Sequence, residues 1–87
     1  MVREFLITNK RGLHARAAAR FVKVTEQFDA QVDVAKDGET VSGTSILGLM
    51  MLAASAGTTI SVSAIGKEAA DALDALERLV ANGFDEE

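Results

Sequence analysis

The side chain with the most distinctive chemistry in this sequence is His14, the only histidine in the chain. It follows Gly12 and precedes an alanine-rich stretch that predicts a helix beginning at residue 15. The backbone N–H groups of a first helical turn have no partner inside the helix, and together with the helix dipole they bind phosphate. The same positive field favours neutral imidazole, the nucleophilic form. This spacing therefore predicts a histidine that could accept a phosphoryl group beside a pocket for that group.

Arg16 is the second candidate member of this site, because its guanidinium can form a charge-assisted clamp on phosphate. The sequence lacks the residues that other phosphate-handling sites need. There is no second histidine, no glycine pattern of a P-loop and no pairing of carboxylates that would hold Mg²⁺. We therefore expect no metal and no cofactor. A lone histidine near a helix start is also typical of a cap or an ordinary surface residue, so the residue types alone leave both interpretations open.

The charge distribution supports an anionic ligand or partner at this end of the chain. The net charge is −4, the wrong sign for a general nucleic-acid binder. Five of the nine basic residues nevertheless fall within fourteen positions that contain no acidic residue: Lys10, Arg11, Arg16, Arg20 and Lys23. This cluster predicts a locally positive surface on an acidic protein, although a solvated helix face would have the same pattern.

Length and composition predict a single domain spanning residues 1–87, since a second core would leave each half too small to bury enough apolar surface. The absence of cysteine excludes disulfides and thiolate chemistry and favours a cytoplasmic protein. The longest apolar run, residues 46–54, is about half the roughly 20 residues that a membrane span needs. We therefore expect no membrane insertion.

Seven elements must position these residues. Apolar alternation and helical spacing predict strands at 2–8, 31–36, 40–42 and 59–64 and helices at 15–28, 45–53 and 67–81. Asp37-Gly38 indicates a hairpin, Gly83 a helix stop, and residues 85–87 a fraying acidic tail. The order β-α-β-β-α-β-α predicts an α+β open-faced sandwich, a four-stranded antiparallel sheet covered on one face by three helices.

Two motifs together resemble those of a known family. Gly12-Leu13-His14-Ala15-Arg16 is followed some thirty residues later by Gly43-Thr44-Ser45-Ile46-Leu47-Gly48-Leu49-Met50. Both motifs, their separation, the element order and the length resemble HPr, the histidine-containing phosphocarrier family of bacterial phosphotransferase systems. The resemblance covers essentially the whole chain and implies a monomeric carrier that is itself a covalent intermediate rather than an enzyme.

By this resemblance, His14 matches the family's phosphorylated histidine, which carries the phosphoryl group on Nδ1. It implies transfer from phospho-Enzyme I, charged by phosphoenolpyruvate, to a histidine of an IIA-type acceptor, as in sugar transport. Arg16 matches the arginine that stabilises the transferring phosphate, and the backbone N–H groups of Ala15 and Arg16 complete the cradle. Ala17 stands where the family usually has proline, which predicts a more mobile helix start with intact chemistry.

The second motif implies regulation and docking. Ser45 matches a serine that a dedicated HPr kinase/phosphorylase modifies in many members, and it is also a typical helix N-cap. The helix that follows is apolar on all sides. We expect Leu49, Leu52 and Ala53 to be buried. The predicted docking surface for both protein partners combines an apolar centre with a basic rim: Ala15, Ala17, Arg20, Lys23, Ile46, Leu47 and Met50.

Three alternatives stay open. An NPr-type carrier of the nitrogen-related phosphotransferase system would use the same histidine and fold. An acylphosphatase-like enzyme would need a side-chain amide beside the arginine, and Asn9 and Asn82 are predicted to lie badly for that role. A non-catalytic regulatory or RNA-binding domain would need aromatic residues or a glycine-rich pocket, whereas the chain has no Tyr or Trp.

Overall fold

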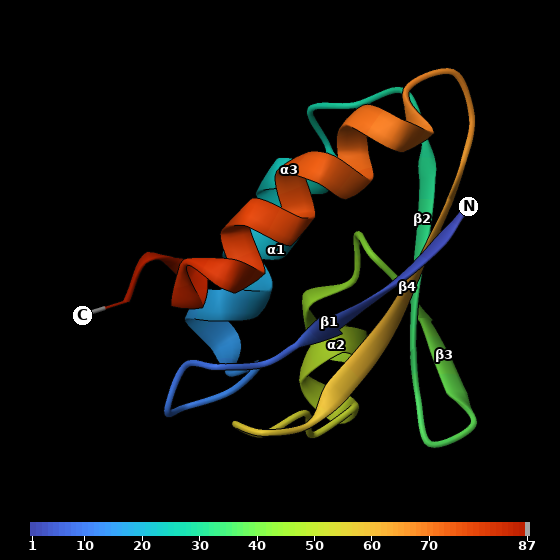
Figure 1. Ribbon diagram of the computed structural model, residues 1–87. Helices are drawn as coiled ribbons and strands as arrows, with labels where there is room; N and C mark the ends of the chain where they lie inside the picture. Colours follow the sequence, from blue (N-terminus) through green and yellow to red (C-terminus); the bar gives the residue numbers. More distant parts are fainter. Residues whose placement is uncertain (87) are drawn as a thin grey trace.

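The sheet and helices follow the predicted order. The computed structural model describes residues 1–86. Its elements are β1 (Val2–Leu6), α1 (Ala15–Thr25), β2 (Gln31–Lys36), β3 (Glu39–Ser42), α2 (Ile46–Met51), β4 (Thr59–Ile65), α3 (Ala69–Ala81) and a short 3-10 helix, η1 (Gly83–Asp85). The strands form one antiparallel sheet in the order β1-β4-β2-β3, and the helices lie on one of its faces (Figure 1). The predicted open-faced sandwich is therefore confirmed.

The sheet forms where side chains alternate between apolar and polar. On β4, Ile60, Val62 and Ala64 are buried while the intervening serines are partly exposed, as the sequence predicts. The hairpin between β2 and β3 turns at Asp37 and Gly38, whose φ values of 51° and 84° both lie in the left-handed region that such two-residue turns require. These strands form the floor of the core.

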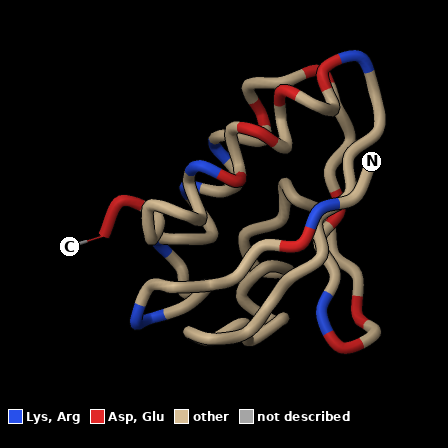
Figure 2. The backbone as a smooth tube through the Cα atoms, viewed as in Figure 1, with Lys and Arg blue, Asp and Glu red and all other residues tan. Residues whose placement is uncertain are grey.

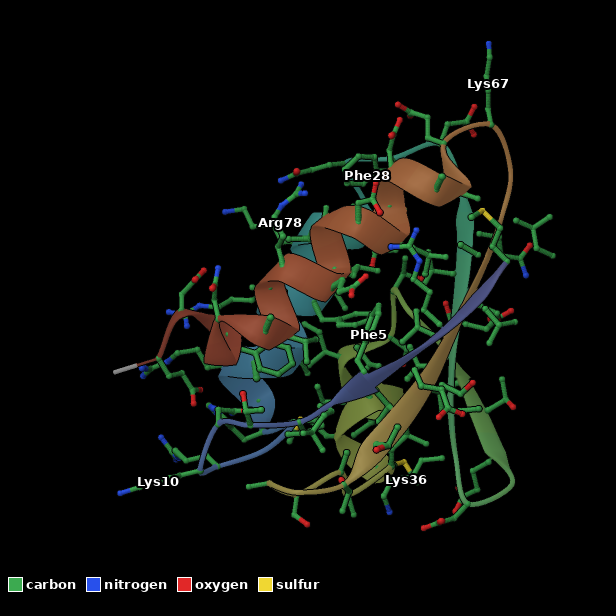
Figure 3. The ribbon with its side chains drawn as sticks, viewed as in Figure 1. Phe5, Lys10, Phe28, Lys36, Lys67 and Arg78 are labelled. Atoms are coloured by element: carbon green, nitrogen blue, oxygen red, sulfur yellow. The ribbon has the colours of Figure 1, made fainter. Side chains whose placement is uncertain are left out.

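The core lies between this floor and the helices. Phe5 extends from β1 into that space, as Figure 3 shows, and it is 3% exposed. Ala18, Phe21 and Thr25 form the buried face of α1, in agreement with the helical spacing. The helix ends three residues earlier than predicted, because its last turns tighten: Phe28 N–H donates to the carbonyl oxygen of Thr25 at 3.2 Å.

The C-terminal segment differs from the prediction. Gly83 ends α3 with a φ of 62°, as expected of a glycine stop. Phe84 then turns back into the core and is fully buried, and η1 packs against α1 and α3. The predicted fraying is wrong for Asp85 and Glu86, because the buried phenyl ring holds this turn against the domain; Glu87 lies outside the described residues. Within residues 1–86, no helix has the length and apolar character needed to cross a membrane.

Candidate functional site

His14 is the N-cap residue of α1, as the sequence predicts. Its backbone is extended, with φ −78° and ψ −178°, and its side chain makes no capping hydrogen bond. The first helical hydrogen bond runs from Ala18 N–H to the His14 carbonyl oxygen at 2.8 Å. The N–H groups of Ala15, Arg16 and Ala17 therefore precede the helical ladder and remain available as donors at this end of α1.

The loop that carries His14 is held in place by the segment that follows α2. Leu13 N–H donates to the carbonyl oxygen of Ala54 at 2.9 Å. Gly12 has a φ of 63°, and a Cβ atom there would lie 2.3 Å from the same oxygen. Only glycine satisfies both the left-handed backbone and this close approach. The site is thus built by the β1–α1 loop packed against the chain that follows α2.

Ala17 is wrongly placed in the predicted docking surface. It is fully buried, because it lies one helical turn before Phe21 on the core side of α1. Ala15 and Lys23 are exposed, as predicted, and Arg20 is half-buried with its Nη1 donating to the carbonyl oxygen of Phe84. Arg20 therefore also stabilises the fold, because one nitrogen of its guanidinium binds the C-terminal turn.

A pocket of about 800 Å³ opens beside the start of α1. Figure 2 shows basic residues in the loop before α1 and acidic residues at the nearby C-terminal end. Lys10, labelled in Figure 3, extends from this loop toward solvent. Four basic residues, two acidic residues and three uncharged residues line it: Lys10, Arg11, Arg16, Arg20, Asp85, Glu86, Thr8, Asn9 and Gly83. Four of the five residues of the basic cluster therefore border this cavity, where they outnumber the two carboxylates and favour an anion.

Glu86 is a member of this site that the sequence reasoning missed. Its Oε2 contacts His14 Nε2, and its Oε1 accepts a hydrogen bond from Asn9 Nδ2 at 3.0 Å. The side chains of His14 and Glu86 are only 17% and 16% exposed. The aromatic Phe84, isolated beyond the glycine stop, was the available signal that the tail folds back.

Asn9 also belongs to the site, although its amide binds the histidine loop and Glu86 and is not the water-positioning amide of the acylphosphatase alternative. It is 7% exposed, and its Nδ2 donates to the Gly12 carbonyl oxygen at 2.8 Å as well as to Glu86. Two acceptors on one atom assign that atom as the amide nitrogen. Among the described residues, Asn9 Oδ1 has no hydrogen-bond partner. The Asn9 side chain thus ties the histidine loop to the C-terminal segment.

These contacts change the pKa of the Glu86 carboxyl group. The hydrogen bond with His14 lowers the pKa of Glu86 below its ordinary value of 4.5, and the Asn9 hydrogen bond and the Arg11 charge act in the same direction, while burial opposes them. A carboxylate with a lowered folded-state pKa stabilises the fold above its unfolded-state pKa, and this stabilisation is lost as the pH falls through the folded-state value. The His14–Glu86 contact therefore contributes at neutral pH and weakens in acid.

We expect urea unfolding to show this contribution. The free energy of unfolding of the wild type should exceed that of Glu86→Gln above pH 4.5, and the difference should shrink as the pH falls below that value. Asp85→Asn, which removes the neighbouring charge but not the contact with His14, is the matched control. A difference independent of pH between 2 and 7 would contradict the assignment.

The predicted α2 surface is largely as expected. Ser45 is the N-cap of α2, and its Oγ accepts a hydrogen bond from Gly48 N–H at 2.9 Å. Leu49 and Leu52 are buried, whereas Ala53, predicted to be buried, is exposed because the chain turns there with a φ of 53°. The exposed apolar side chains of this region, with fractions from 40% to 68%, are Ile46, Leu47, Met50 and Met51.

No metal centre forms within the described part of the chain. No three His, Asp or Glu side chains among residues 1–86 gather as metal ligands. The chemistry available at the start of α1 is that of an imidazole with a carboxylate against it, backbone N–H donors and guanidinium groups. This arrangement can bind an anion and accept a phosphoryl group on a ring nitrogen.

Comparisons with known proteins agree with this chemistry. The family model described as "PTS HPr component phosphorylation site" matches residues 1–82. The phosphocarrier protein HPr of Pseudomonas putida is 49% identical over 85 residues, covering 97% of this chain and 94% of that protein. The phosphocarrier protein NPr of Shewanella violacea is 42% identical over 84 residues, covering 97% and 92%.

The fold comparison gives the same result. The crystal structure of HPr from Thermoanaerobacter tengcongensis aligns with a TM-score of 0.94 and 40% identity, covering 100% of this chain and 98% of that one. The sequence match over nearly the full length and the arrangement of the sheet and helices thus agree. The chain belongs to the HPr family of phosphocarrier proteins of the phosphotransferase system.

Proposed function

We propose that this chain accepts a phosphoryl group on His14 from phospho-Enzyme I and passes it to a histidine of an IIA-type acceptor. The observation that carries the proposal is the position of His14 as the N-cap of α1, beside three N–H groups that precede the helical ladder. Family membership supports the same role. The protein would then be a covalent intermediate of a relay and not a catalyst with turnover of its own.

In this proposal each group at the helix start has one task. The His14 ring supplies the lone pair that bonds to phosphorus. The N–H groups of Ala15 and Arg16 bind the oxygen atoms of the phosphoryl group, and the exposed Arg16 guanidinium offsets its charge. Donors fixed by the helix need no reorganisation during transfer, which lowers the barrier in both directions.

The proposed docking surface joins the two helices that flank His14. Helices α1 and α2 pack against each other, so the exposed α2 side chains continue the surface around the histidine. Its apolar part is Ile46, Leu47, Met50 and Ala15, and its basic rim is Arg20 and Lys23, with Ala17 removed because it is buried. An apolar centre with a basic rim fits a partner surface that is apolar in the middle and acidic around it.

Reconstitution of the relay tests the proposal. The protein is incubated with labelled phosphoenolpyruvate and Enzyme I, and then with IIA proteins of sugar and nitrogen-related systems. We expect an acid-labile label that moves to one class of IIA protein, and that class distinguishes an HPr role from an NPr role. Failure to acquire label from either type of Enzyme I, or steady release of inorganic phosphate from an acyl phosphate, would contradict the carrier function.

We propose that phosphorylation of Ser45 inhibits docking and not folding. Ser45→Asp should slow transfer from Enzyme I by about tenfold, the effect of roughly 1.4 kcal/mol of repulsion and desolvation at the interface. Aspartate is also a good N-cap, so the free energy of unfolding should hardly change.

Ser45→Ala is the matched control. It removes the hydrogen bond from Gly48 N–H to Ser45 Oγ and should cost about 1 kcal/mol of stability, yet leave the transfer rate unchanged. Rates from stopped label transfer and urea unfolding curves separate the two effects. Unchanged transfer in Ser45→Asp would remove the regulatory proposal.

A further inference from the structure

The contact between Glu86 and His14 involves a specific ring nitrogen. Glu86 Oε2 contacts Nε2 of the imidazole, and its other oxygen is held by Asn9 Nδ2 at 3.0 Å. Both carboxylate oxygens therefore have partners. The two side chains are less than one-fifth exposed, so water competes only weakly for the contact.

Three contacts hold the carboxylate in place. Phe84 is fully buried, and its carbonyl oxygen accepts a hydrogen bond from Arg20 Nη1. The Glu86 N–H donates to the Gly83 carbonyl oxygen at 3.1 Å, closing the last turn. Asn9 binds both the carboxylate and the Gly12 carbonyl oxygen, so one buried amide fixes the histidine loop and the C-terminal turn relative to each other. The Glu86 side chain is thus positioned by the fold.

The chemistry of this pair selects one form of the ring. Neutral imidazole has a single N–H, and an ionised carboxylate can only accept a hydrogen bond. A carboxylate against Nε2 therefore requires the proton on Nε2 and leaves the lone pair on Nδ1. We propose that Glu86 is a positioning residue that holds His14 in the tautomer whose Nδ1 is the nucleophile. This inference rests on the proposed function for its consequence in transfer, although the tautomer itself is a property of the resting protein.

The transfer step balances with this assignment. The Nδ1 lone pair forms the bond to phosphorus while the bond between phosphorus and the nitrogen of the donor phosphohistidine breaks, and that electron pair returns to the donor ring. The Nε2 proton stays where it was, so the phosphorylated His14 ring is cationic and faces the Glu86 carboxylate. In the onward step the electron pair returns to Nδ1 as the acceptor histidine bonds to phosphorus. Glu86 contacts neither the phosphoryl group nor the partner in either step.

Glu86→Gln is the discriminating variant. Glutamine has nearly the same shape, but its amide can donate to Nε2 as well as accept from it, so it no longer selects a tautomer. Asp85→Asn is the matched control, because it removes one charge at the neighbouring position, whose side chain is exposed and lines the same pocket. Asparagine also tolerates the φ of 61° at that position.

The first measurement is the ¹⁵N spectrum of ring-labelled His14 in the unphosphorylated protein, at a pH where the ring is neutral. The wild type and Asp85→Asn should show a pyridine-type shift for Nδ1 and a pyrrole-type shift for Nε2. In Glu86→Gln both shifts should move toward the values of exchanging tautomers. Identical spectra for Glu86→Gln and the wild type, or an equal change in Asp85→Asn, would overturn the assignment.

The second measurement is the rate of phosphoryl acceptance from phospho-Enzyme I. The maximal rate should fall severalfold in Glu86→Gln. The donor concentration at half-maximal rate should stay unchanged, because Glu86 contacts the His14 imidazole and lies outside the proposed docking surface. An unchanged maximal rate would overturn the role in transfer. If the wild type accepts no phosphoryl group at all, the carrier function fails, whereas the ¹⁵N result still decides the tautomer.

Discussion

His14→Ala should abolish phosphorylation from phosphoenolpyruvate and Enzyme I, whereas the wild type should acquire a label that is lost in acid. The chain contains no other histidine, so no second imidazole can replace the missing nucleophile. The N–H donors and guanidinium groups that remain at the helix start bind an anion but form no bond to phosphorus, and the Glu86 carboxylate, whose pKa is lowered, is a poor nucleophile. The expected loss is therefore complete and not partial.

Ser45→Ala and acid treatment control this experiment. A phosphoryl group on serine is stable in acid, so a label that survives acid in the wild type and disappears in Ser45→Ala would indicate the wrong site. The side chain of His14 makes no capping hydrogen bond, so His14→Ala should keep the circular dichroism spectrum of the wild type. Label retained on a folded His14→Ala protein would remove the proposed mechanism.

Much of the architecture could be predicted because it follows local periodicity. Strand β2 was predicted with its observed bounds, since Val32 and Val34 alternate with polar residues and Asp37-Gly38 specifies the turn. The placement of His14 as N-cap also followed from local sequence, because Gly12 and the alanines mark the start of the helix. Periodicity of 2.0 or 3.6 residues is visible without knowing which elements pack together.

The incorrect predictions concern residues whose positions depend on tertiary contacts. Alanine at position 17 has no polarity that marks a face, and only the packing of α1 on the sheet shows that it is buried. The acidic residues after Gly83 are typical of a fraying end, yet Glu86 lies against His14, 72 positions earlier in the chain. Asn9 is an ordinary turn residue in sequence, and its amide acquires a role only when both ends of the chain meet. No local pattern predicts a contact between residues so far apart in the sequence.

Phe84 is the residue on which this long-range part of the site depends. It is fully buried although it follows the last α-helix, and its backbone adopts a φ of 56°, which non-glycine residues rarely do. Such a conformation persists only when the surrounding packing stabilises it. The phenyl ring belongs to the hydrophobic core and its turn packs against α1 and α3, so its burial is the available source of that stabilisation. The ring therefore couples the hydrophobic core to the position of Glu86.

We expect Phe84→Ala to lower the free energy of unfolding by about 3–5 kcal/mol, the usual cost of removing a buried phenyl ring. The same change should release the C-terminal turn, so the ¹⁵N shifts of His14 should move as they do in Glu86→Gln. Leu76→Ala is the matched control: Leu76 is also fully buried, on α3, and its loss should cost about 2–5 kcal/mol while the His14 shifts stay unchanged. Urea unfolding and ¹⁵N spectra of the folded variants test both parts. If Phe84→Ala cost less than about 1 kcal/mol, or if Leu76→Ala moved the His14 shifts equally, the core would not be what holds Glu86 on the histidine.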